Sequence, residues 1–303
     1  MQCHVTRSPP AAESFCRNLE NALKRADPET EAPTDVPTGA PSLPGNVRLC
    51  ESVGDPHFTS FSGHRFDFYG LGLFTLVDAP DVTVQAVHKQ WGRASANSAL
   101  AFCDKGTNRS ITLWSGTTLS VSNSTETCGG HCRLELQGST AVWTHDSGIE
   151  VYAQGWSGSS FLNVHVVVDG NSINTTEGLC GDVKSESMSG IDNTSVAESD
   201  SCYQVLPGET WADITVIPDT YTPSDTCDVE SSRIQAAAVC NACTCVGAFE
   251  DCVKDVCATG DLATASMTCD ACEQRETIVT KYLPTPAPSV SPTPTTEPPS
   301  EPP

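Results

Sequence analysis

Cys50-Glu51-Ser52-Val53-Gly54-Asp55-Pro56-His57-Phe58-Thr59, continued by Ser60-Phe61-Ser62-Gly63-His64-Arg65-Phe66-Asp67-Phe68-Tyr69-Gly70, is the stretch of this 303-residue chain that decides its fold. A second stretch, Glu177-Gly178-Leu179-Cys180-Gly181, stands far downstream. Around and between them apolar residues recur at every second position, and clusters of Gly, Asn, Asp and Ser separate the runs. This pattern is typical of antiparallel strands joined by turns. We therefore expect a mainly β domain, a sandwich or barrel-like fold, over residues 47–226.

The alternating runs predict individual strands of this domain. The run Phe161–Val168 is the most continuous, and the Asp-Gly-Asn cluster behind it favours a turn, so we expect a central strand there. A domain of this length is large enough to bury a core. The other expected strands are Leu73–Val77, Val82–Val87, Ile111–Trp114, Leu119–Val121, Leu134–Leu136, Ala141–Trp143 and Ile149–Tyr152.

Charge limits the classes of partner. The formal net charge is -22, from 38 acidic and 16 basic residues, and no stretch gathers Lys or Arg into a stripe. Such a surface repels phosphates, so nucleic acid and anionic membranes are not expected partners. No segment approaches 18 consecutive apolar residues, and we expect no membrane span in this chain.

The cysteines point to an oxidising compartment. The chain has 16 of them, an even number, and four Asn-x-Ser/Thr sequons at Asn108, Asn123, Asn174 and Asn193. Disulfides and N-glycosylation are both typical of secreted proteins. We therefore expect an extracellular, disulfide-bonded glycoprotein, secreted or at the cell surface. The rival interpretation is a metal-binding, cysteine-rich protein of a reducing compartment, with zinc on Cys240-x-x-Cys243-x-Cys245 and Cys269-x-x-Cys272.

Composition divides the rest of the chain. Residues 1–26 contain a short amphipathic helix at 11–25, which Cys3 and Cys16 could link to its neighbour, and residues 27–46 are a Pro-rich linker. Residues 227–275 form a cysteine-rich module with helical apolar spacing. Residues 276–303 form a Pro/Ser/Thr-rich tail, expected to be disordered and extended. No apolar signal sequence follows Met1, so we expect a fragment or a start further upstream.

The order of the two opening motifs resembles a known family. Gly54-Asp55-Pro56-His57, with Phe66-Asp67-Phe68-Tyr69-Gly70 behind it and Gly178-Leu179-Cys180-Gly181 downstream, is similar to the signatures of the von Willebrand factor type D domain. The resemblance covers about residues 47–227. A shorter resemblance, over residues 248–261, is to the C8 module that commonly follows a type D domain. The adjacent cysteine pair of that module is replaced here by Cys240, Cys243 and Cys245.

The resemblance implies specific disulfides and a calcium site. By similarity, Cys50 and Cys180 bridge the two ends of the domain, whereas the pairing of the other cysteines stays open. The family places carboxylates and amides around a Ca²⁺ ion, and the matching residues are Asp55, Asp182, Asp192 and Asn193, with Lys184 at a position usually held by an oxygen ligand. The cysteines expected in disulfides are Cys50, Cys103, Cys128, Cys132, Cys180, Cys202, Cys227, Cys240, Cys243, Cys245, Cys252, Cys257, Cys269 and Cys272.

The Asp55–Pro56 bond permits one chemical reaction. Some members of the family cut themselves there, because the Asp carboxylate can attack its own main-chain carbonyl while the Pro nitrogen leaves, and His57 could supply the proton. The plainer interpretation is a turn in which His57 only packs. The redox chemistry of family members with Cys-Gly-Leu-Cys is not expected, because Glu177 stands at the first cysteine position.

No motif of a turnover enzyme is present. The chain has no Gly-x-Ser-x-Gly, no phosphate-binding Gly-rich loop and no His-Glu-x-x-His. We therefore expect a structural and adhesive module of matrix, mucus-like or cell-surface assemblies. Its expected partners are other extracellular matrix or mucin-like proteins, or a second copy of itself. The alternatives are a self-cleaving module and the metal-binding, cysteine-rich protein.

Overall fold

A computed structural model describes residues 43–107, 109–114, 120–122, 130–156, 159–185, 190–206, 208–245 and 247–283. The expected N-terminal helix at 11–25, most of the linker and the tail from residue 284 lie outside this range. So do Cys3, Cys16, Cys128, Asn108 and Asn123.

The first part of the described chain consists of strands joined in antiparallel pairs. The eight expected strands are all present, and β1, β2, β3 and β6 are additional to them. The strands are β1 (Val47–Val53), β2 (His57–Thr59), β3 (Arg65–Asp67), β4 (Gly72–Asp78), β5 (Val82–Trp91), β6 (Ala94–Asp104), β7 (Arg109–Trp114), β8 (Ser120–Ser122), β9 (Cys132–Gln137), β10 (Thr140–His145), β11 (Ile149–Gly155) and β12 (Leu162–Asp169).

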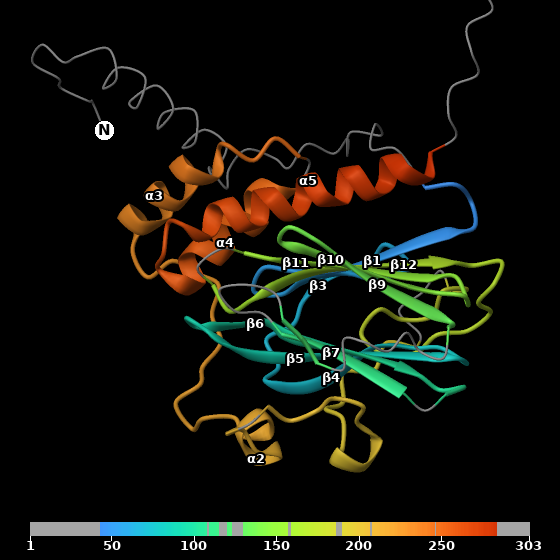
Figure 1. The fold of residues 1–303 in the computed structure, drawn as a ribbon. Coiled ribbons are helices and arrows are strands. Elements are labelled where there is room, and N and C mark those ends of the chain that lie inside the picture. The colour runs from blue at the N-terminus through green and yellow to red at the C-terminus, as the bar shows by residue number, and fades with distance from the viewer. Residues whose placement is uncertain are drawn as a thin grey trace, which may run out of the picture.

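These strands form two stacked layers, which confirms the antiparallel sandwich (Figure 1). One layer has the strand order β3-β2-β1-β12-β11-β10-β9, and the other contains β4 to β8. The layers are joined in one sheet through a single paired position, Leu162 of β12 with Asn97 of β6. Stacked rings of Phe102 and Trp143, 4.9 Å apart, connect β6 with β10 across the core.

Strand β12 is central, as its continuous apolar run predicts. It pairs with β1 on one side and with β11 on the other. Val164, Val166 and Val168 point into the core between the layers, whereas Val167 points to the opposite face. Both faces of this strand are covered, which explains why it lacks the usual alternation with polar residues.

Helices cover the face of the β12 layer that points away from the core between the two layers. Helices α3 (Glu230–Cys240), α4 (Ala248–Thr259) and α5 (Thr264–Tyr282) lie together against one side of the sandwich (Figure 1). Ile278 and Tyr282 of α5 pack against Val167 and Tyr152 of the sheet. Helix α5 continues past residue 275, where the cysteine-rich module was expected to end. None of the described helices is long and apolar enough to cross a bilayer.

On the opposite side, the short helix α2 (Trp211–Thr215) packs its Ile214 against the other layer. A capping box between Thr210 and Asp213 begins this helix, because each side chain accepts a hydrogen bond from the other residue's main-chain N–H. The single-turn 3-10 segment Glu198–Asp200 precedes it.

Candidate functional site

The Gly-Asp-Pro-His motif forms the turn between two paired strands. Strand β1 ends at Val53 and β2 begins at His57, and these two residues are partners in the ladder. Gly54 adopts φ = +64°, and a Cβ atom added there would lie 2.5 Å from a carboxylate oxygen of Asp255. Glycine is therefore required at this position both by the backbone conformation and by the close approach of helix α4.

The helical module covers this turn. The main-chain N–H of Asp55 donates to Asp255 Oδ1 at 2.9 Å, and the N–H of Gly54 donates to Asn163 Oδ1 at 3.1 Å. The amide nitrogen of Asn163 donates in turn to the Met267 carbonyl at 3.0 Å. The turn is thus held between the central strand and helices α4 and α5, and Asp55 and Asp255 are both fully buried.

His57 lies at the centre of a cluster of carboxylates. Its Nδ1 is 2.6 Å from Asp67 Oδ1, and its Nε2 is 3.1 Å from Asp55 Oδ1 and 3.3 Å from Asp255 Oδ1. Lys254 Nζ donates to the other oxygen of Asp67 at 2.6 Å. Two segments some 200 residues apart in the sequence therefore supply one buried polar cluster.

The charges in this cluster shift each other's proton affinity. Burial, and then the nearby Asp255 carboxylate, raise the pKa of Asp55 to about 8. Burial by itself lowers the pKa of His57, but the surrounding carboxylates, Asp255 first, raise it well above its ordinary 6.5. Burial also opposes ionisation of Asp67, yet the hydrogen bonds from His57 and Lys254 prevail and hold the pKa of Asp67 well below its ordinary value.

A cavity of 290 Å³ lies beside the cluster and is bordered by His57, Asp251 and Thr268. The two arginine side chains that line the cavity are ion-paired with carboxylates. Arg65 bonds to Asp251, and Arg275 Nε lies 3.2 Å from Glu51 Oε1. The cavity gives small ions or water a place next to the buried side chains.

Comparison with known proteins shows what the β part resembles. Residues 50–189 match the family model of the von Willebrand factor type D domain. This part of the chain is therefore similar to a type D domain. It is also 25% identical over 236 residues to the human IgGFc-binding protein, an alignment that covers 72% of this chain and 4% of that protein. The chain thus spans a small part of the length of this relative.

The disulfide implied by the resemblance is confirmed. Cys50 on β1 is bonded to Cys180 of the Gly-Leu-Cys-Gly segment, which ties the two signatures of the type D domain together. Main-chain bonds from Leu179 to Thr75 and from Cys180 to Leu76 align that segment with β4. The pairing that the sequence left open is Cys103–Cys202 in the type D domain, where Cys132 is also disulfide-bonded.

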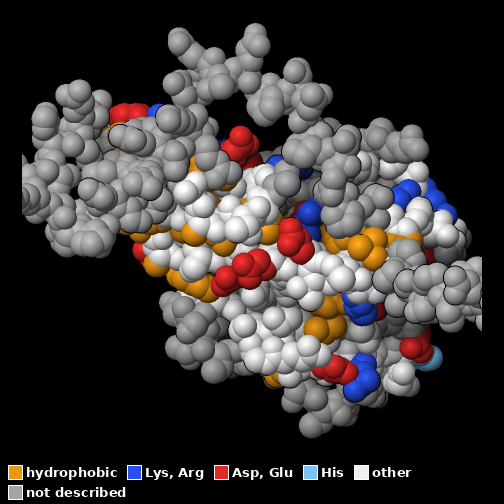
Figure 2. Space-filling view, turned by 90° about the horizontal axis from the view of Figure 1, so that it is seen from above, with side chains coloured by type: hydrophobic (Ala, Val, Ile, Leu, Met, Phe, Trp, Pro, Cys, Tyr) orange, Lys and Arg blue, Asp and Glu red, His pale blue; other side chains and the backbone are white. Residues whose placement is uncertain are grey.

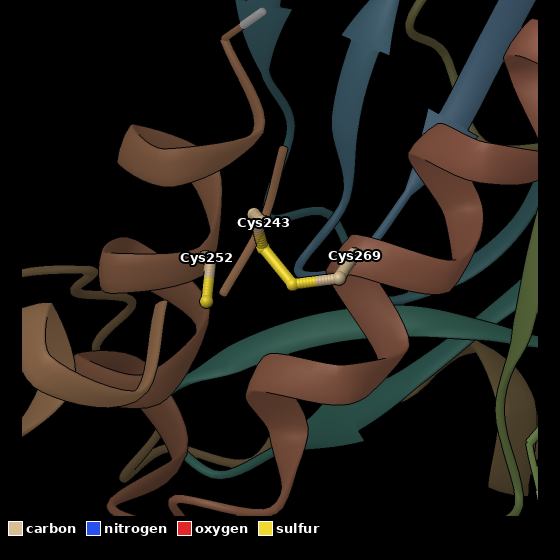
Figure 3. A group of neighbouring side chains, drawn as sticks. All are labelled: Cys243, Cys252 and Cys269. Carbon is tan, nitrogen blue, oxygen red and sulfur yellow. A yellow bond between two sulfur atoms is a disulfide. The ribbon is translucent and has the colours of Figure 1, made fainter. Parts of the chain in front are cut away.

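The eight cysteines of the helical module are paired with each other, as Cys227–Cys257, Cys240–Cys252, Cys243–Cys269 and Cys245–Cys272. Figure 3 shows the bond between Cys243 and Cys269, with the sulfur of Cys252 beside it. A zinc site on these sulfurs requires thiolates, and disulfide sulfurs are not thiolates. The structure therefore favours the disulfide interpretation over the thiolate zinc site.

The residues proposed for calcium are not drawn together as one group. Asp55 is buried with His57 and Asp255, whereas Asp192 and Asn193 are exposed and Asp182 is half-buried. The side chains of Asp182 and Asp192 each accept a bond from a main-chain N–H two residues onward, and Lys184 Nζ donates to the Gly170 carbonyl. Calcium binding stays a prediction. Of the glycosylation candidates, Asn174 and Asn193 are exposed in the structure.

The sequence did not predict that Asp67 and Asp255 belong to the Asp55–His57 site. Both lie within the motifs that carry the family resemblance, Asp67 behind the turn motif and Asp255 in the C8-like stretch. No spacing rule connects Asp255 with Asp55, because their proximity depends on how helix α4 docks. Asp67 could have been found from the short hairpin, in which it is paired with His57.

Proposed function

We propose that the chain is an extracellular structural module that mediates adhesion or assembly in matrix, mucus-like or cell-surface material. The observation that carries the proposal is the packing of the type D domain against the disulfide-bonded helical module, with hydrogen bonds and apolar contacts between them. Arg93, at the tip of the β5–β6 hairpin, donates to the Cys257 carbonyl at 2.9 Å and forms an ion pair with Asp228. Together with the buried turn and the α5 contacts, these bonds fix the relative position of the two parts.

A rigid body of this kind presents a constant surface to partners. In Figure 2, which views the helical side, acidic and apolar side chains lie next to each other, and the described atoms show no continuous basic patch. Large apolar side chains are exposed elsewhere, with Val216 at 64% and Ile217 at 55% of their full area. This mixture suits contacts with proteins better than contacts with polyanions. The proposed partners are matrix or mucin-like proteins and a second copy of this chain.

Binding of the secreted, purified chain tests this proposal. Surface plasmon resonance would compare an immobilised mucin-type glycoprotein, a second copy of the chain and the Fc part of IgG, the last because the name of the human relative refers to it. Saturable binding to any of these that is lost in V216D/I217D supports the proposal. L136D, at an exposed apolar residue on strand β9, away from the segment after helix α2 that carries Val216 and Ile217, is the matched control. Absence of binding to all three, or equal loss in both variants, contradicts it.

We infer a second candidate, single-turnover self-cleavage at Asp55–Pro56, from the geometry of the turn. Both side-chain oxygens of Asp55 are buried and make no hydrogen bond within the described residues, and its main-chain N–H is held by Asp255. In the reaction an Asp55 carboxyl oxygen would attack the Asp55 main-chain carbonyl carbon and form a cyclic anhydride. The C–N bond to Pro56 would break, and the carboxyl proton would move to the Pro56 nitrogen. Water would then open the anhydride to two carboxyl groups.

Mass spectrometry of the chain, with and without reduction of its disulfides, tests whether the Asp55–Pro56 bond is cleaved. Cys50–Cys180 and the β1–β12 ladder would keep the short fragment attached, so two fragments should separate only after reduction and denaturation. The Asp27–Pro28 bond is an internal control for ordinary acid lability. A cut at Asp55–Pro56 alone, abolished in D55A, supports the candidate. An intact chain at pH 5.5 and 7.4, or equal cleavage at both Asp–Pro bonds, contradicts it.

A further inference from the structure

We propose that Asp55, His57 and Asp255 bind one divalent transition-metal ion of the zinc class at the junction between the type D domain and the helical module. One ligand atom from each of the three residues lies within 4.8 Å of the other two, and all three residues are buried. The turn between β1 and β2 supplies two of them, and helix α4 supplies the third.

The spacing of the ligand atoms fits such an ion. His57 Nε2 lies 3.1 Å from Asp55 Oδ1 and 3.3 Å from Asp255 Oδ1. Zinc bonds of about 2.0–2.1 Å in a tetrahedron place neighbouring ligand atoms about 3.3 Å apart. Ca²⁺ takes about six to eight oxygen ligands, and a group of two carboxylates and one imidazole falls short of that number. The ligand types therefore favour zinc over calcium.

The surroundings orient the ligands. His57 Nδ1 lies 2.6 Å from Asp67 Oδ1 and donates to it, so Nε2 is the ring nitrogen that faces the other two carboxylates and binds the ion in place of its own proton. A carboxylate behind a histidine is the usual support of a metal-bound imidazole. Asp255 is fixed in the same way, since Thr268 donates to its Oδ2 and the Asp55 N–H donates to its Oδ1.

The cluster turns several oxygen atoms toward one position. His57 Nε2 faces Asp55 Oδ1, Asp255 Oδ1 and the Asp251 carbonyl oxygen, which is 3.3 Å away. Apart from this Nε2, no donor among the described residues contacts the side-chain oxygens of Asp55, which is fully buried. An ionised Asp55 is costly there without a counter-charge. An ion of charge +2 neutralises both Asp55 and Asp255, whereas one proton on His57 neutralises one of them and Lys254 already balances Asp67.

The adjoining cavity completes the site. It borders His57 and Thr268, and its 290 Å³ give room for a water molecule as the fourth ligand and a path for the ion. A bound ion would hold the Asp55 carboxylate and displace its proton, so metal binding and self-cleavage exclude each other in one molecule. The binding itself does not depend on whether the chain cuts itself.

Metal binding by the full secreted chain tests the proposal. After removal of metals with a chelator, Zn²⁺ would be titrated by calorimetry, the bound ion counted by elemental mass spectrometry, and Co²⁺ used as a spectroscopic probe. We expect one Zn²⁺ per chain, an intense visible Co²⁺ spectrum typical of tetrahedral coordination, and no displacement by Ca²⁺. H57Q and D255N should weaken Zn²⁺ binding at least about 100-fold. H131Q, which changes an exposed histidine, is the matched control and should bind as the wild type does.

A variant that leaves the three ligands in place guards against misfolding. D67N removes the carboxylate that supports His57 and pairs with Lys254, and about 10- to 100-fold weaker binding is expected with a complete set of disulfides. Absence of stoichiometric Zn²⁺ in the wild type overturns the proposal, as does retention of Zn²⁺ by properly folded H57Q and D255N. An NMR spectrum of the metal-treated protein with protons on both ring nitrogens of His57 also overturns it, because a proton then occupies the proposed position of the ion.

Discussion

Buried His88 should make the folded chain less stable in mildly acidic solution. It lies on β5 with its ring 5.2 Å from Phe74, 5.7 Å from Phe68 and 6.2 Å from Phe58. Burial lowers its pKa to about 4, and weaker contacts with Asn97 and the Gly70 backbone oppose the shift. The folded state therefore keeps His88 neutral at a pH at which the unfolded chain, with an ordinary pKa near 6.5, already binds a proton.

The sign and size of the effect follow from this difference. Because the unfolded state binds more protons between these two pKa values, the free energy of unfolding rises with pH in that interval and falls on acidification. For pKa values of about 4 and about 6.5, the loss between pH 7 and pH 5 is about 2 kcal/mol, and it approaches about 3 kcal/mol near pH 4. Other groups titrate as well, so the informative quantity is the difference in slope between the wild type and a variant without the histidine.

Denaturant unfolding at pH 7 and pH 5, with the disulfides intact, measures this quantity. H88L removes the titrating ring in an apolar setting, and its free energy of unfolding should fall by about 2 kcal/mol less between the two pH values than that of the wild type. H131L, which changes an exposed histidine, should keep the wild-type slope. Equal slopes for H88L and the wild type would refute the reasoning, as would a His88 pKa near 6.5 in an NMR titration.

Three further substitutions probe the joint between the two parts of the chain. G54A should lower the free energy of unfolding by about 1–3 kcal/mol. G63A should cost less, because Gly63 has a similar positive φ but open space around it, and thermal unfolding of the two variants compares them. N163A removes the partner of the buried Gly54 N–H and a second donor to the Met267 carbonyl, and should cost about 1–3 kcal/mol; a loss below about 0.5 kcal/mol in urea unfolding would show that water replaces the amide. C50A/C180A opens a loop of sequence separation 130 and should cost about 4–5 kcal/mol in the chain-entropy account, with reduced secretion as its readout.

The alternation of apolar residues predicted the strands that are rich in residues of high β-propensity. It did not predict β1, β2, β3 and β6. Strand β6 begins Ala94-Ser95-Ala96-Asn97-Ser98-Ala99, a run of small residues with little intrinsic preference for a strand. It is nevertheless buried along nearly its whole length, because it lies between β5 and β7 and contributes to the cores on both faces. Small side chains there are explained by the close packing of neighbours, which a local pattern does not report.

The sequence by itself predicted the antiparallel sandwich and the presence of disulfides, and its resemblance to the type D family implied the Cys50–Cys180 bond, because motifs, two-residue periodicity and cysteine count are properties of the chain read in order. Only the tertiary structure decided the other disulfide partners and the composition of the His57 cluster. Asp255 lies 200 positions from Asp55 and reaches it because helix α5 buries apolar residues against the outer face of β12 and β1, while helix α4 packs on α5 within the helical module. Such a contact depends on the docking of two surfaces, and neither surface exists until its own part of the chain has folded.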